Sequence, residues 1–376
     1  MLNTNLDRRE WLKTAGTAIA GLAFVSQAPR LRAQHEADKS AARSEPVRIS
    51  FNENPFGPSP AVTAAILQTT DSCCRYPVAE VEKLVKQIAE KEGVPKEYIV
   101  LGVGSGEILD MTGIHCGLNK GEIIAAEPGY LQIIETAERF GGKGVWVPLD
   151  KDLKHDLNAL AAKVNERTSL VYICNPNNPT GTIVNPNDLR EFIKTVSPKA
   201  PVFVDEAYLD CSDNYAANTM VDMVRKGFNV VVTRTFSKIH GMAGLRIGYG
   251  IMQPKFAKKV QPFGTGSLNI LGVVGASASL EDKPFIEETR LKIKAGRDAL
   301  IAVVKELGKT YAEPQGNFVF IKTGMDVKEF GEKMKAENIL VGRPFPPLTT
   351  WARISIGLPE QMAVCHQAMR KVLKPA

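Results

Sequence analysis

Four short apolar runs lie in the first two thirds of the chain, and each is followed, directly or after a few residues, by polar or charged residues. They cover residues 98–101, 170–173, 201–204 and 229–233, and their length and composition predict buried strands. Between residues 78 and 88, apolar side chains recur at helical spacing, which predicts a helix with one apolar face. Strands that alternate with helices indicate an α/β fold with a mostly parallel sheet and helices on both faces.

Functional side chains follow three of these predicted strands. Asn178 comes after the strand 170–173, Asp205 and Tyr208 come after 201–204, and Lys238 comes after 229–233. An open α/β sheet places its ligand groups at the carboxyl ends of its parallel strands. A single such residue has an ordinary explanation, because Lys238 could be a solvated loop lysine and Asp205 a helix cap. The series in chain order favours one shared site.

Two further segments carry groups suited to a phosphate. Thr235, Ser237 and Arg246 surround Lys238 in the sequence and are donors to an anion. The segment 102–107, Gly-Val-Gly-Ser-Gly-Glu, lies between a predicted strand and a predicted helix start, and it includes Ser105 and Gly106. Glycines allow the backbone to approach a phosphate, and a helix N-terminus attracts an anion. The Gly-x-Gly-x-Gly spacing alone also leaves a dinucleotide-binding loop open.

The motifs together resemble those of pyridoxal-phosphate-dependent aminotransferases of fold type I, in particular the histidinol-phosphate aminotransferase branch. The resemblance rests on Asn-Pro-Asn-Asn-Pro-Thr-Gly at 175–181, Asp-Glu-Ala-Tyr at 205–208, and Ser-Lys at 237–238 followed by Arg246. It extends from Val47 to the C-terminus. It implies a large pyridoxal-phosphate-binding domain at 71–265 with a mostly parallel central sheet, and a smaller α+β domain formed by 47–70 and 266–376.

The resemblance also implies a role for each site residue. Lys238 corresponds to the Schiff-base lysine that also moves the substrate proton, and Asp205 to the acid that pairs with the ring nitrogen of pyridoxal 5′-phosphate. Tyr208 and Asn178 correspond to donors to the cofactor's 3′ oxygen, and Tyr130 to the residue that stacks on its ring. The implied phosphate ligands are Ser105, Gly106, Thr235, Ser237 and Arg246.

On the substrate side, Arg353 corresponds to the arginine that binds the α-carboxylate as a bidentate fork, which lysine does poorly. Asn54 belongs to the segment 51–55 that borders the substrate pocket. Tyr76 corresponds to a tyrosine that reaches across a dimer interface to the neighbouring cofactor's phosphate, so a homodimer is expected. Arg343 matches an arginine that holds the substrate phosphate. The stretch from Arg343 to Arg353 is about two residues shorter than in the family and rich in proline, which leaves phosphate binding open.

The N-terminus resembles a twin-arginine export signal. Arg8 and Arg9 precede Trp11, Leu12 and a mildly apolar stretch, so we expect residues 1–33 to be a signal peptide and 34–46 a linker. The stretch is too short and too rich in glycine and alanine for a stable membrane span. A periplasmic location follows, with a cytoplasmic one as the alternative.

The charge of the chain gives no reason to expect a nucleic-acid partner. Residues 1–33 contain five basic and two acidic side chains, so removing them would take +3 from the formal net charge of +6. The six cysteines show no Cys-x-x-Cys spacing, and no metal site is expected. Buried free thiols are expected, with a disulfide at Cys73 or Cys74 left open.

The predicted reaction is the transfer of an amino group from an α-amino acid to a 2-oxo acid. Three alternatives remain from the sequence. Another pyridoxal-phosphate reaction (racemase, lyase, decarboxylase or oxidase) would use the same Lys238 and Asp205. A nucleotide-dependent oxidoreductase rests only on the glycine loop. A binding or regulatory protein would keep the fold without turnover, which the complete set of site residues disfavours.

Overall fold

The described part of the chain contains a seven-stranded sheet. The structure is a computed structural model that describes residues 45–374 of the 376. The predicted signal peptide, 1–33, and all but the last two residues of the predicted linker, 34–46, lie outside the described residues. From Val47 onward the chain forms one compact unit.

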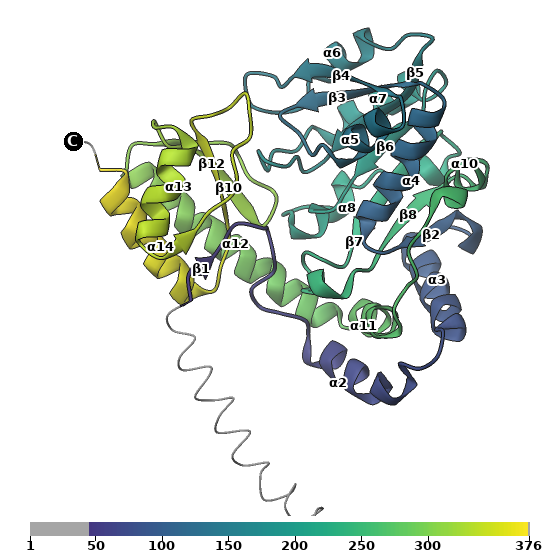
Figure 1. The fold of residues 1–376 in the computed structure, drawn as a ribbon, viewed down its shortest axis with the longest axis horizontal. Helices are drawn as coiled ribbons and strands as arrows, with labels where there is room; N and C mark the ends of the chain where they lie inside the picture. The colour runs from purple at the N-terminus through teal and green to yellow at the C-terminus, as the bar shows by residue number, and fades with distance from the viewer. Residues whose placement is uncertain (1–44, 375–376) are drawn as a thin grey trace, which may run out of the picture. The chain divides into compact units, whose positions relative to one another are not determined.

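The central sheet has the strand order β2-β8-β7-β6-β5-β3-β4 (Figure 1). β8 runs antiparallel to both of its neighbours, and every other neighbouring pair from β7 to β4 is parallel. The strands are β2 (Ile99–Gly102), β3 (Glu122–Glu127), β4 (Lys143–Pro148), β5 (Thr168–Cys174), β6 (Val202–Asp205), β7 (Val230–Thr235) and β8 (Gly248–Met252). The predicted α/β fold with a mostly parallel sheet is confirmed.

Helices cover both faces of this sheet, which explains why its strands contain mostly apolar residues rather than alternating apolar and polar ones. One apolar core joins the sheet to α4 (Ser105–Leu118), α5 (Gln132–Arg139) and α10 (Pro254–Val260). The core on the other face joins it to a second group of helices. That group is α2 (Pro60–Thr69), α3 (Val78–Glu92), α6 (Leu157–Ala162), α7 (Pro186–Val196), α9 (Val221–Arg225) and α11 (Ile270–Glu281). A four-residue helix, α8 (Tyr215–Asn218), follows β6.

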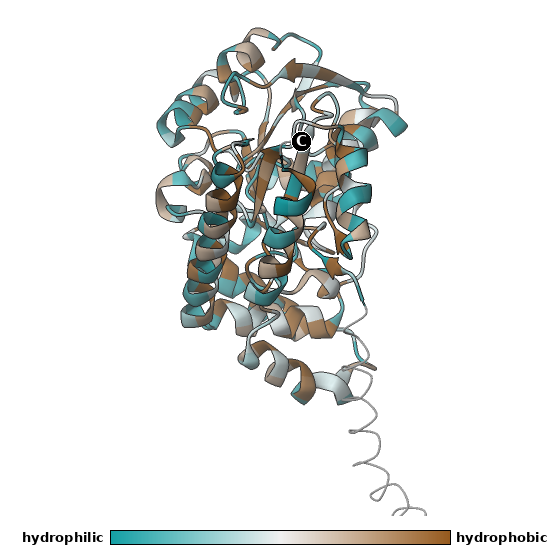
Figure 2. Ribbon diagram, turned by 90° about the vertical axis from the view of Figure 1, so that its left-hand side faces the viewer, coloured by the Kyte–Doolittle hydropathy of each residue, from teal (hydrophilic) through white to brown (hydrophobic). Residues whose placement is uncertain are grey.

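A third core forms around the C-terminal elements. The antiparallel sheet β12-β10-β9 packs with α12 (Lys283–Glu306), α13 (Val327–Ala336) and α14 (Pro359–Val372). Its strands are β9 (Thr310–Tyr311), β10 (Phe318–Lys322) and β12 (Trp351–Ser355). β1 (Val47–Arg48) pairs in parallel with β11 (Ile339–Leu340), so the first described strand joins the C-terminal elements. Figure 2 shows hydrophobic and hydrophilic stretches side by side on these helices.

All predicted strands and helices are present, with ends shifted by a few residues. The helix predicted between residues 78 and 88 is part of α3. The strands predicted at 98–101, 170–173, 201–204 and 229–233 are β2, β5, β6 and β7. The boundaries 71–265, 47–70 and 266–376 stay a prediction, although the pairing of β1 with β11 agrees with a small domain built from both ends of the chain.

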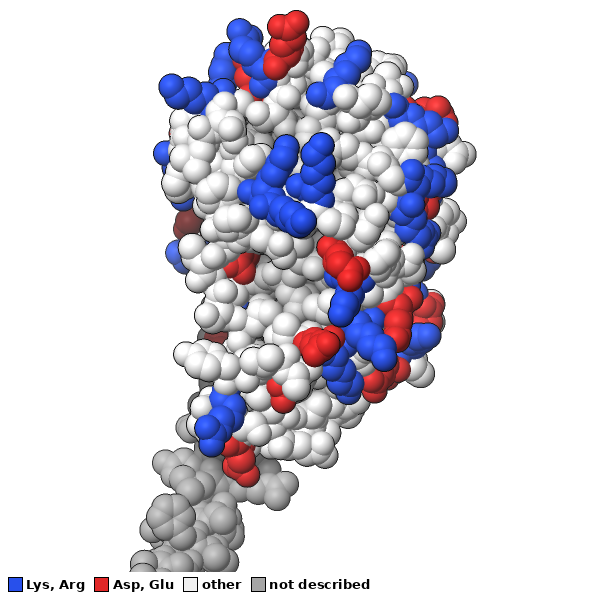
Figure 3. All heavy atoms as spheres, turned by 90° about the vertical axis from the view of Figure 1, so that its right-hand side faces the viewer, with Lys and Arg blue, Asp and Glu red and all other residues white. Residues whose placement is uncertain are grey.

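The surface and the thiols add two observations. On the face drawn in Figure 3, basic and acidic side chains are interspersed, apart from one group of basic side chains. Cys73 and Cys74 are exposed free thiols, and the other four cysteines are buried and unpaired by disulfides.

Within residues 45–374 no helix has the length and apolar character needed to cross a membrane. The same residues contain no cluster of three side chains suited to a metal ion.

Candidate active site

A cavity of about 990 Å³ lies where β5, β6 and β7 end. These three strands are parallel and in register, with Cys174 opposite Asp205 and Asp205 opposite Thr233. Their carboxyl ends therefore bring residues distant in sequence to one place. The predicted site residues that line the cavity are Ser105, Gly106, Tyr130, Asn178, Asp205, Tyr208, Thr235, Ser237, Lys238, Arg246, Arg343 and Arg353.

Lys238 follows β7 and is half-buried. Its Nζ donates to the backbone oxygen of Phe51 at 3.3 Å and lies 5.3 Å from the centre of the Tyr208 ring. Burial lowers the pKa of Lys238 to about 8, and the charge of Arg353 acts in the same direction. The neutral amine, which is the nucleophilic form, is thus accessible near neutral pH.

Asp205 ends β6 and is 2% exposed. Its Oδ1 accepts from the Thr233 hydroxyl at 3.0 Å, and its Oδ2 accepts from the Tyr172 hydroxyl at 3.1 Å. Burial raises the pKa of Asp205, while these two hydrogen bonds and the charge of Lys238 oppose that rise. A carboxylate fixed in this way at a buried position is suited to a cationic N–H group of a ligand.

Thr233 and Tyr172 were not identified from the sequence. Thr233 lies on β7 directly opposite Asp205, and Tyr172 lies on β5 opposite Phe203, two residues before Asp205. The signal that could have found them is the twofold alternation of side chains along a strand. Thr233 and Thr235 share one face of β7, and Thr235 was already a candidate.

Tyr208, Asn178 and Arg353 form a connected group. The Asn178 amide donates to the Tyr208 oxygen at 3.4 Å, and its Oδ1 accepts from Arg353 Nη1 at 2.6 Å. Arg353 Nη2 also donates to the backbone oxygen of Ser50 at 2.7 Å. Its Nε is buried and has no hydrogen-bond partner within the described residues. A buried donor without a partner costs free energy, so this nitrogen is suited to an anionic ligand group.

The N-terminus of α4 faces the side chains that follow β7. Gly104 precedes this helix at a φ of 76°, and a Cβ built there would lie 2.3 Å from Arg246 Nη2. Arg246 Nη1 donates to the Ser237 hydroxyl at 3.3 Å, and the Thr235 hydroxyl donates to the same oxygen at 3.0 Å. Because the first turn of a helix leaves backbone N–H groups without partners in the helix, this arrangement can bind a phosphate.

Tyr130 lies at the cavity beside Gln132. Its hydroxyl donates to Gln132 Oε1 at 3.0 Å, and Gln132 Nε2 donates to the Gly106 carbonyl at 3.0 Å. The phenol ring is therefore tied to the first turn of α4. Burial raises the pKa of Tyr130 to about 12, so the ring stays neutral.

Two predicted residues do not line the cavity. Asn54 is buried, and its amide donates to the backbone oxygen of Ile239 at 2.7 Å, so it holds the segment that follows Lys238. Tyr76 is 88% exposed. Its predicted place is the cavity of a second copy of the chain, and its exposure is compatible with that role.

Arg343 lies at the cavity close to Phe345. The guanidinium carbon of Arg343 lies 4.5 Å from the centre of the Phe345 ring, and that of Arg353 lies 4.9 Å from it. One aromatic ring thus contacts both guanidinium groups. Two positive charges at one end of the cavity favour an anionic substrate.

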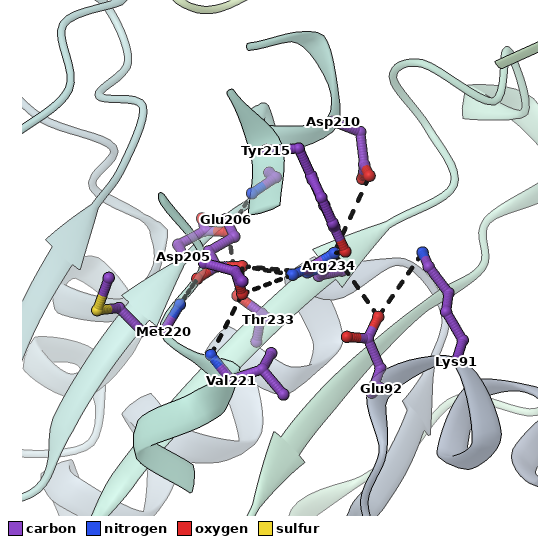
Figure 4. Close-up of polar contacts among 12 residues, drawn as sticks. Lys91, Glu92, Asp205, Glu206, Asp210, Tyr215, Met220, Val221, Thr233 and Arg234 are labelled. Atoms are coloured by element: carbon purple, nitrogen blue, oxygen red, sulfur yellow. Dashed lines mark hydrogen bonds and ion pairs between the residues drawn. The ribbon is translucent and has the colours of Figure 1, made fainter. Parts of the chain in front are cut away.

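An ion-pair cluster lies directly beside the candidate site (Figure 4). Arg234, on β7 between Thr233 and Thr235, is 1% exposed. Its Nη2 lies 2.8 Å from Oε2 of Glu206, the residue after Asp205, and its Nη1 lies 3.6 Å from Glu92 Oε1. Glu206 also accepts from the backbone N–H of Met220 at 2.6 Å. The cluster joins the ends of β6 and β7, and no pattern in the sequence predicted it.

Comparison with known proteins gives one consistent result. The family model for aminotransferase class I and II matches residues 44–368. A histidinol-phosphate aminotransferase of Moorella thermoacetica is 35% identical over 90% of this chain and 88% of its own length. Histidinol-phosphate aminotransferase 2 of Ralstonia nicotianae is 34% identical over 94% of this chain and 95% of its own length.

Solved structures agree. Histidinol-phosphate aminotransferase from Sinorhizobium meliloti in complex with pyridoxal-5′-phosphate has a TM-score of 0.80 and 28% identity, covering 90% of this chain and 94% of that one. A mutant of Thermus thermophilus aspartate aminotransferase, with a TM-score of 0.75 and 20% identity, covers 87% of this chain and 96% of its own and shares the fold.

Proposed function

The chain belongs to the class I and II aminotransferases and is a pyridoxal-phosphate-dependent transaminase, and we propose that the cavity around Lys238 is where it moves an amino group from an α-amino acid to a 2-oxo acid. The observation that carries this placement is the joint presence of Lys238, Asp205 and the phosphate-binding arrangement in one cavity.

The residues at the cavity fit the cofactor. Asp205 offers a buried carboxylate to a ring nitrogen, and the end of α4 with Ser237 and Arg246 offers donors to a phosphate. Gly104 leaves the space that a side chain would fill. Pyridoxal phosphate, when bound, supplies the aldehyde that takes up the amino group and a ring that accepts electrons from the Cα–H bond.

Each residue then has a defined task. Lys238 Nζ is the base for the substrate's Cα proton, and its lowered pKa provides the neutral form. Asp205 would pair with the ring nitrogen of the cofactor and favour its protonated form. Asn178 orients both the Tyr208 hydroxyl and the Arg353 guanidinium through its hydrogen bonds to them. The guanidinium fork of Arg353 binds the α-carboxylate.

A panel of amino donors, scored by absorbance change of the bound cofactor, tests this function. We expect an amino donor alone to convert the cofactor to its pyridoxamine form, and a 2-oxo acid to reverse the change. Lys238→Ala abolishes both changes and leaves the circular dichroism of the protein intact. Release of carbon dioxide or ammonia without any oxo acid would instead favour a decarboxylase or lyase on the same residues.

The substrate carries a second anionic group besides its α-carboxylate. Arg343 and Arg353 on either side of Phe345 support this proposal. The curated relatives are named for histidinol phosphate, a phosphorylated amino alcohol that carries a phosphate and no α-carboxylate, so it does not fit this description. Dicarboxylic amino acids fit it, because they carry a second carboxylate. Arg343→Leu should raise the KM of the preferred donor about tenfold or more, with little change for alanine, if Arg343 binds this group.

The protein acts in the periplasm on a substrate other than histidinol phosphate. The twin arginine at 8–9 and the short, proline-rich stretch from Arg343 to Arg353 support this proposal. Export of a folded protein suits an enzyme that must acquire its cofactor in the cytoplasm. Cell fractionation of the full-length chain tests the location. Full rescue of a histidine auxotroph by low expression of a chain without residues 1–33 would contradict the substrate proposal.

The active form is a homodimer in which Tyr76 contacts the cofactor phosphate of the second copy. Its 88% exposure, with Val78 at 76% and Phe51 at 66%, supports this, because large apolar side chains are usually covered. Light scattering gives the mass. Tyr76→Phe should weaken cofactor binding about tenfold while leaving the mass unchanged.

A further inference from the structure

Asn52 lies at the cavity in a backbone conformation that few residues adopt. It lines the cavity, is 1% exposed and has a φ of 54°. A positive φ is uncommon outside glycine, and asparagine tolerates it better than most residues. Such a conformation persists where the surrounding contacts hold it in place, and these contacts define what Asn52 does.

Ser355 fixes the orientation of the Asn52 amide. The backbone N–H of Asn52 donates to the Ser355 oxygen at 2.9 Å, so the single hydroxyl hydrogen of Ser355 is directed to another acceptor. That acceptor is Asn52 Oδ1, at 2.9 Å. The amide oxygen of Asn52 therefore faces Ser355, and its nitrogen faces the other way. The backbone oxygen of Asn52 accepts from Asn317 at 2.9 Å, which anchors the main chain as well.

The Asn52 nitrogen faces Tyr208. Nδ2 donates to the Tyr208 oxygen at 3.1 Å, and the Asn178 amide donates to the same oxygen at 3.4 Å. A phenol oxygen has two lone pairs and one hydrogen. Since both amides act as donors, the Tyr208 hydrogen is directed to neither of them. It remains available for an acceptor in the cavity.

The same asparagine connects two distant parts of the chain. Ser355 lies on β12 two residues after Arg353, and side chains two apart on a strand share a face. Tyr208 lies just beyond β6. One buried side chain thus joins the end of the central sheet to the strand that carries the carboxylate-binding arginine.

We propose that Asn52 is a positioning residue of the transamination: it keeps the Tyr208 hydroxyl proton directed into the cavity and ties Tyr208 to the strand of Arg353. The inference rests on the proposed function, because the acceptor for that proton would be the 3′ oxygen of pyridoxal phosphate. A donor there withdraws electron density from the oxygen and so weakens proton binding at the adjacent nitrogen of the Lys238 linkage.

The test is a pH titration of the visible absorbance of the holoenzyme without substrate. Asn52→Gly keeps the left-handed backbone and removes the amide. We expect the midpoint to rise by about half to one pH unit, the size of one hydrogen bond. Asn338→Gly is the matched control, because Asn338 has a φ of 61° and does not line the cavity. It should leave the midpoint within about 0.2 pH unit of the wild-type value, well below the shift expected for the loss of one hydrogen bond.

A double-variant cycle distinguishes an effect on the position of the Tyr208 hydroxyl from a general change in the structure of the cavity. Tyr208→Phe alone should raise the midpoint, and Asn52→Gly in that background should add nothing, because the hydroxyl it positions is gone. If Asn52→Gly fails to fold, Ser355→Ala serves instead and should give a smaller rise in the same direction. The proposal would be overturned if Asn52→Gly shifted the titration midpoint equally with and without the Tyr208 hydroxyl. It would also be overturned if neither Asn52→Gly nor Ser355→Ala shifted the midpoint.

Failure of the proposed function has a different outcome. A wild-type protein with added pyridoxal phosphate that shows no titrating visible band would refute the placement of the cofactor at Lys238. A normal wild-type band with an unchanged Asn52→Gly midpoint would refute only the role of Asn52.

Discussion

Replacing Arg234 by methionine removes the centre of the buried ion-pair cluster beside the active site. The change leaves Glu206 without its closest cation, at 0% side-chain exposure, while Arg234 itself is only 1% exposed. Glu206 keeps the backbone N–H of Met220 at 2.6 Å and the hydroxyl of Thr219 at 3.0 Å. These neutral donors do not compensate for a lost guanidinium contact at 2.8 Å.

Breaking such a pair from one side costs about 3–5 kcal/mol, because it leaves an uncompensated buried charge. At roughly 2 °C per kcal/mol for a chain of this size, the Tm of Arg234→Met should fall by about 6–10 °C. Burial raises the pKa of Glu206 to about 7, and Arg234 opposes this rise, so the variant raises the pKa further. A carboxyl with a raised folded pKa loses stability as pH increases through that pKa. The deficit in Tm should therefore be smaller at pH 6 than at pH 8.

Thermal unfolding of the apoprotein, followed by circular dichroism, is the appropriate assay, because bound cofactor would add its own stabilisation. Adding Glu206→Gln to Arg234→Met removes the unpaired charge and should recover part of the loss. A Tm of Arg234→Met within about 1 °C of the wild type would show that the pair contributes little, as exposed pairs do. A further loss in the double variant would refute the assignment of the cost to an unpaired Glu206.

Three other substitutions and titrations examine the cavity. Gly104→Ala should weaken cofactor binding about tenfold or more in an equilibrium titration, because its φ is 76° and its Cβ would lie 2.3 Å from Arg246 Nη2. Gly331→Ala, with no atom within 4 Å of its Cβ, is the control and should bind normally. The rate at which the apoprotein takes up pyridoxal phosphate should rise with pH and level off above about 8, since the neutral amine of Lys238 is the nucleophile; a flat profile from pH 6 to 9 would contradict this. Arg353→Lys should raise the KM of the amino donor about tenfold or more, because a lysine cannot form the fork; an unchanged KM would place the carboxylate elsewhere.

The sequence predicted the residues that line the cavity better than those that support them. Lys238, Asp205 and Asn178 each follow an apolar run, so their places at strand ends could be predicted before any contact was known. The apolar runs also predicted the central sheet, because parallel strands that are buried on both faces consist mostly of apolar residues. β3 and β4 are equally regular in the structure, and their sequences would have supported the same prediction.

Asn54 and Asn52 show where pattern alone is insufficient. They lie two residues apart in one segment, and only Asn54 was selected from it. The structure gives Asn54 a backbone acceptor at Ile239 and places Asn52 against Tyr208. The difference depends on a left-handed turn at Asn52 that nothing in the local sequence specifies. Contacts between residues 303 positions apart, such as Asn52 with Ser355, are beyond any periodicity.

β7 shows why the supporting residues and the site residues are inseparable. Thr233 and Thr235 donate to Asp205 and Ser237 on one face of β7, so Arg234 between them points to the opposite face. There it meets Glu206, the first residue after β6. Consecutive residues at the ends of two neighbouring strands thus face the cavity on one side and form an ion pair on the other. A change that shifted β6 by one residue against β7 would exchange Asp205 and Glu206, placing the ion-pair carboxylate in the cavity and burying the site carboxylate opposite Arg234. The buried pair therefore selects the register in which Asp205 meets Thr233.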